Sequence, residues 1–60
     1  RVLNLTTTSN EPILFNWDNV ICVVNSSDPF GNEYCEIHTV EGGGVQVKEK
    51  VSEIKSKLTN

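Results

Sequence analysis

The side chains with reactive chemistry are few in this sequence of 60 residues: two cysteines, one histidine and eight carboxylates. Cys35 and His38 lie three positions apart in a segment with the composition of a strand, and odd spacing sends their side chains to opposite faces of a sheet. They therefore do not converge as a nucleophile and its base, or as ligands of one metal ion. We predict a protein that is not an enzyme, with no catalytic residue, no metal ligand and no cofactor.

Three consecutive glycines at positions 42–44 resemble the start of a loop that cradles a phosphate group. Such loops continue with Gly-Lys-Ser or Gly-Lys-Thr inside a βαβ unit, and neither feature is present here. Glycines also supply the unrestricted φ that a tight hairpin needs. The sequence therefore predicts a turn at this position.

Charge is distributed unevenly along the chain, whose formal net charge is −3. Residues 1–47 carry six acids against one arginine, and residues 48–60 carry four lysines against two acids. An acidic body repels phosphate backbones, which argues against a general nucleic-acid binder. The basic tail leaves open a small nucleic-acid-binding regulator in which Tyr34 or Trp17 stacks on bases, with phosphate contacts from Lys48, Lys50, Lys55 and Lys57.

A chain this short is expected to form a single domain, residues 1–60, with a marginal core that needs support from disulfides, a metal or oligomerisation. No secretory signal is visible, and the longest apolar run, residues 20–24, is too short to insert in a membrane. We predict a cytoplasmic protein in which Cys22 and Cys35 are buried and reduced.

Hydrophobic patterning predicts an α+β fold: a small, strongly bent antiparallel sheet of four to five strands, barrel-like, with one C-terminal helix. Alternating or β-branched segments predict strands at residues 2–7, 13–15, 20–24, 33–40 and 45–47. Residues 48–58 change to the helical period, and their apolar stripe consists of Val47, Val51, Ile54 and Leu58.

The turn formers between residues 25 and 32 predict a hairpin. If Asn25 pairs with Asn32, then Cys22 lies opposite Cys35 and Val23 lies opposite Tyr34. That register makes a disulfide geometrically conceivable, although two reduced thiols fit a cytoplasmic chain better.

Residues 20–24 are apolar at every position, so both faces of this strand need cover, and one helix covers only one face. The second face requires either a sheet that curls towards a barrel or a second copy of the chain. We therefore expect a homo-oligomer that also binds an unidentified protein partner. Aromatic side chains at turns are good anchors for such contacts, and the interface candidates are Trp17, Ile21, Val23, Phe30 and Tyr34.

Short motifs along nearly the whole chain resemble the FlbD family of small flagellar proteins, also called SwrD. They are Val2-x-x-Leu5-Thr6, the turn before Ile13, Phe15-Asn16-x-Asp18-x-Val20, Glu41-Gly42, and Val47-Lys48-Glu49-x-Val51-x-Glu53-Ile54. The resemblance implies a compact, non-catalytic protein that supports the flagellar motor. A weaker resemblance to the LytTR DNA-binding domain lies in residues 17–24, in Tyr34-x-x-Ile37-x-Thr39 and in the terminal helix.

Overall fold

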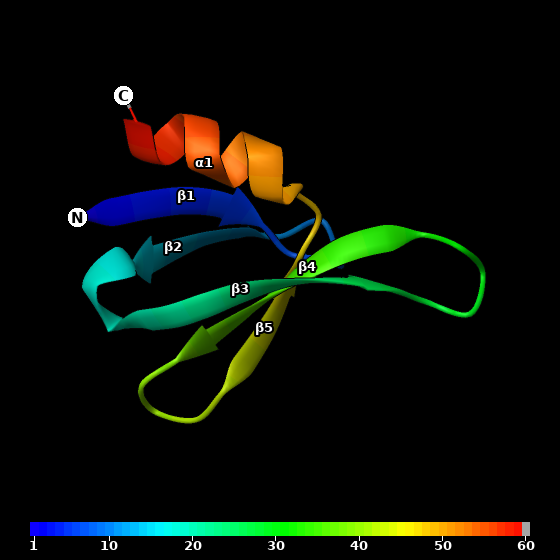
Figure 1. Ribbon diagram of the computed structural model, residues 1–60, viewed down its shortest axis with the longest axis horizontal. Helices are drawn as coiled ribbons and strands as arrows, with labels where there is room; N and C mark the ends of the chain where they lie inside the picture. The colour runs from blue at the N-terminus through cyan, green and yellow to red at the C-terminus, as the bar shows by residue number, and fades with distance from the viewer. Residues whose placement is uncertain (60) are drawn as a thin grey trace.

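The computed structural model describes residues 1–59, which form five β-strands, one short 3₁₀ helix and one α-helix (Figure 1). In chain order the elements are β1 (Val2–Thr6), β2 (Pro12–Asn16), η1 (Trp17–Asn19), β3 (Val20–Ser27), β4 (Glu33–Thr39), β5 (Gly44–Val47) and α1 (Val51–Thr59). The predicted α+β class, the antiparallel pairing and the C-terminal helix are confirmed.

Strands β1 and β2 form an antiparallel hairpin in which Leu3 pairs with Phe15 and Leu5 pairs with Ile13. These side chains share one face of the hairpin, and Leu3, Leu5 and Phe15 are buried in the core. Side chains on the opposite face, such as Leu14, point to solvent. The alternation of apolar and polar residues in the sequence thus corresponds to an inner and an outer face.

Strands β3, β4 and β5 form a second antiparallel sheet with β4 in the middle. The predicted register of the β3–β4 hairpin is wrong: Asn25 pairs with Cys35 and not with Asn32, a shift of three residues. Cys22 consequently lies opposite His38, and Val23 lies opposite Ile37. Since a shift by an odd number reverses which side chains share a face, Cys22 and Cys35 lie on opposite faces and cannot form the conceivable disulfide.

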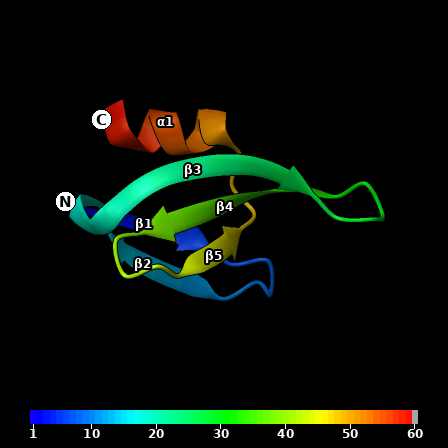
Figure 2. The same cartoon turned by 60° about the horizontal axis from the view of Figure 1, so that its bottom comes forward.

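The two sheets are joined at the ends of β1 and β5. Thr7 and Val47 form an isolated antiparallel bridge, and the Lys48 N–H donates to the Thr6 carbonyl at 2.8 Å. Within residues 1–59 the ladders remain two separate sheets and do not close into a barrel. Figure 2 shows β3, β4 and β5 passing over β1 and β2, with α1 running alongside β3.

Helix α1 begins three residues later than predicted, because the preceding residues are held in other contacts. The Glu49 carboxylate accepts from the Thr6 N–H at 2.9 Å, and the Glu53 carboxylate accepts from the Lys50 N–H at 3.3 Å, the latter in the manner of a capping box. Ile54 on the predicted stripe is buried, and Val51 and Leu58 pack against the core. Nowhere between residues 1 and 59 is there a helix with the length and apolar character needed to cross a membrane.

The apolar strand β3 is covered on one face. Val20 and Val23 pack against the core, whereas Ile21 is 65% exposed and Val24 is 47% exposed. A β-bulge at Ile21 interrupts the pairing with β4 between Val20 and Cys22. Cys22 is exposed, so its predicted burial is wrong, while the predicted burial of Cys35 is confirmed.

The centre of the core is β4, where the Ile37 side chain is 0% exposed. We expect Ile37→Val to lower the free energy of unfolding by about 1 kcal/mol and Ile37→Ala by about 2–5 kcal/mol, because the surrounding side chains fill the space only in part. Urea denaturation followed by circular dichroism measures both. The matched control is Leu14→Ala, which removes an exposed side chain and should change stability by less than about 0.5 kcal/mol. Equal effects at the two positions would contradict this assignment of the core.

Candidate interaction surface

The reactive side chains are divided between the two faces of the three-stranded sheet. On the outer face, His38 lies opposite Cys22, and its Nε2 atom lies 2.9 Å from the Glu36 carboxylate. The imidazole is half-exposed, as expected for a strand histidine at the surface. No group of three or more His, Cys, Asp or Glu side chains in residues 1–59 has the geometry to hold a metal ion.

Cys35 lies on the inner face and is 1% exposed. Its thiol donates to the Asn25 side-chain oxygen at 3.4 Å. Burial raises the pKa of the Cys35 thiol, and the nearby carboxylates of Glu49 and Glu53 act in the same direction. A buried thiol held in its neutral form behaves as a small apolar side chain and not as a nucleophile.

The β3–β4 hairpin extends beyond the rest of the molecule (Figure 1). Its tip lies at one end of the long axis, and the N-terminus and the last turn of α1 lie near the other end. Phe30 is at this tip and is 89% exposed, more than any other large apolar side chain in residues 1–59. None of the residues that the structure describes covers this aromatic ring to any great extent.

The tip that carries Phe30 is held by one carboxylate. Asp28 Oδ1 accepts from the N–H groups of Phe30 and Asn32, both at 2.9 Å, and Oδ2 accepts from the Asn32 side chain at 3.0 Å. The Gly31 N–H donates to the Asp28 carbonyl at 3.1 Å, and the φ of Gly31 is +85°, a value that favours glycine. Asp, Pro and Gly stand where a type I turn prefers them. The loop therefore presents Phe30 from an ordered backbone.

A groove of about 530 Å³ lies beside the part of the same hairpin that adjoins its loop. One wall comes from the end of β3 and the start of β4, and the other wall comes from the start of α1. Polar and apolar atoms both line it, and Tyr34 within it accepts a 3.2 Å hydrogen bond from the Ser26 hydroxyl. The lining residues are Asn25, Ser26, Ser27, Glu33, Tyr34, Cys35, Lys50, Val51 and Ser52.

The five interface candidates do not lie on one surface. Trp17 and Val23 pack against the core, so their exposed area is small. Ile21 points to solvent on the outer face of β3, Tyr34 lies at the groove, and Phe30 is at the tip. Sequence reasoning missed the groove, because its two walls come from segments about 25 positions apart. The pattern Asp28-Pro29-x-Gly31, by contrast, does predict the turn at the tip.

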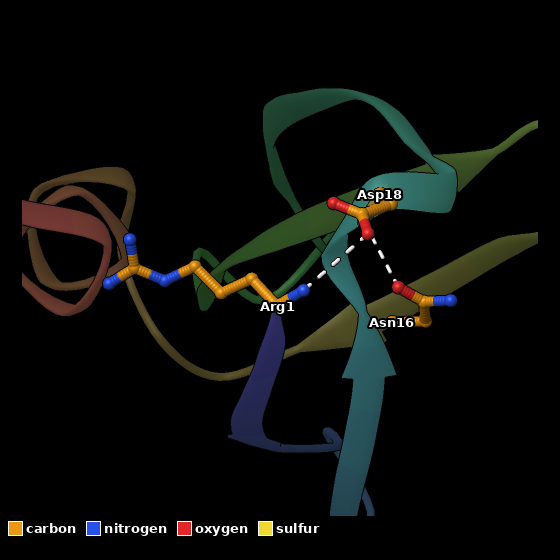
Figure 3. Close-up of polar contacts among 3 residues, drawn as sticks. All are labelled: Arg1, Asn16 and Asp18. Atoms are coloured by element: carbon orange, nitrogen blue, oxygen red, sulfur yellow. Dashed lines mark hydrogen bonds and ion pairs between the residues drawn. The ribbon is translucent and has the colours of Figure 1, made fainter.

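Polar contacts at the other end of the molecule hold the elements together and do not form a site (Figure 3). The main-chain nitrogen of Arg1 lies 3.5 Å from the Asp18 carboxylate, and the Asn16 side chain accepts from the Asp18 N–H at 3.2 Å. The Arg1 guanidinium donates to the Lys57 carbonyl at 2.8 Å, in the last turns of α1. These contacts connect β1, η1 and the helix.

Comparison of the chain with protein-family models, with curated proteins and with solved structures gave no match.

The Asp28 turn has a pH dependence that can be measured. The pKa of Asp28 lies below its ordinary value of 3.8, because the Asn32 N–H, the Asn32 side chain and the Phe30 N–H all donate to the carboxylate. Because the pKa is lower in the folded state, the ionised carboxylate stabilises the fold fully above pH 3.8. This stabilisation is lost as the pH falls through the folded-state pKa. We expect the amide proton shifts of Phe30 and Asn32 to titrate together with a midpoint below pH 3.8. In Asp28→Asn this step should vanish, and a wild-type midpoint at or above the ordinary value would contradict the turn geometry.

The two thiols should differ in reactivity. We expect iodoacetamide to modify Cys22 in the native protein and to modify Cys35 at least about a hundredfold more slowly, because Cys35 reacts only when the domain opens. Mass spectrometry of timed samples measures both rates. In Cys22→Ser no rapid modification should remain until urea is added, whereas equal rates at the two positions would show that Cys35 is not buried.

Proposed function

We propose that this protein is a non-catalytic protein–protein interaction module and that the β3–β4 hairpin tip is its principal contact. The single observation that carries the proposal is the 89% exposure of Phe30 on a turn fixed by five hydrogen bonds. A large apolar ring on a flexible loop would be an ordinary surface residue. On an ordered tip it is ready to enter a partner's pocket.

The energy available from Phe30 is large for one residue. Burying a phenylalanine side chain contributes about 1.5–3 kcal/mol, and little is lost to ordering because the side chain has few rotamers. The fixed backbone lowers the cost further, since the turn is formed before the partner arrives. Residues with these properties are the usual anchors of protein interfaces.

The outer face of β3 offers a second apolar surface through Ile21 and Val24. Residues 1–59 leave Ile21 and Val24 largely uncovered, so self-association, as expected from the sequence, is part of the proposal. The finer expectation that the sheet curls towards a barrel would instead require β2 and β3 to approach and pair. We favour the contact between copies, because the two ladders stay separate within the described residues and Ile21 and Val24 remain exposed.

The alternative function, nucleic-acid binding through the basic tail, has weaker support. The Lys48 ammonium is hydrogen-bonded to the Asn10 side chain, and Glu49 and Glu53 lie among the lysines. A continuous basic surface is therefore absent around the start of α1, within the residues that the structure describes. Tyr34 is only partly exposed and Trp17 packs against the core, which leaves little area for a base to stack on.

We propose that this module works in the cytoplasm and, as the resemblance to the FlbD family implies, supports the flagellar motor. The motif residues that carry the resemblance include Val47 and Ile54 in the core and Glu53 at the cap of α1. These residues have structural roles in this chain, as a proposal of a shared fold requires. We accordingly propose a flagellar role for this protein, with a component of the motor as its partner.

Photo-crosslinking tests the proposed contact directly. We expect the crosslinker p-benzoylphenylalanine at position 30 to give nuclease-resistant protein adducts in the native host, because the ring points into the partner. The matched control is the same crosslinker at Val40, which is 63% exposed and follows the end of β4 that lies away from the tip. Adducts at position 30 that are no stronger than those at position 40, or that disappear with nuclease, would contradict the proposal.

A further inference from the structure

We draw no further inference here: the strongest candidate, the groove of about 530 Å³ between the start of α1 and the loop end of the β3–β4 hairpin, carries none, because Lys50 and Glu33 line it with opposite charges and nothing in residues 1–59 shows what occupies it.

Discussion

The ends of β1 and β5 meet at a short junction, and the rest of the structure depends on it. Thr7 bridges Val47, the Lys48 N–H donates to the Thr6 carbonyl, and the Glu49 carboxylate accepts from the Thr6 N–H. Val47 itself is 0% exposed, so the junction lies over the core. A two-stranded hairpin is only marginally stable by itself in water, and this junction turns two sheets and a helix into one cooperative unit.

The same junction explains why the β3–β4 hairpin projects. Helix α1 must start close to β1, and at nine residues it is too short to cover the whole length of β3. The basal half of the hairpin therefore packs on the core through Val23, Cys35 and Ile37, while the distal half has no layer above it. Its stability has to be local, and Asp28 supplies it by binding three donors of the loop. The groove lies between the start of the helix and the part of the hairpin that continues past it.

Periodicity in the sequence was sufficient to predict the elements and the core stripe of α1. The hairpin register was not predictable in the same way, because the Asp28 side chain closes the loop and makes Ser27 pair with Glu33. The extra residue at Ile21 then shifts the pairing once more. The start of α1 was missed for a related reason, since Lys48 and Glu49 bond to Thr6, more than forty positions away. Local patterns do not contain such long-range partners.

Phe30 at the tip and the outer face of β3 are two exposed apolar surfaces, and the tip is the better candidate for the principal contact with a partner. The His38 and Glu36 pair occupies the middle of that face, so Ile21 and Val24 lie at its edge and do not form a continuous apolar patch. The bulge at Ile21 also increases the local twist of β3, and bulged, twisted edges resist pairing with another strand. A dimer built on this face would have to desolvate the imidazole and the carboxylate together. Burial of the Phe30 ring at the tip removes no imidazole–carboxylate pair from water, so it costs less desolvation for an apolar gain.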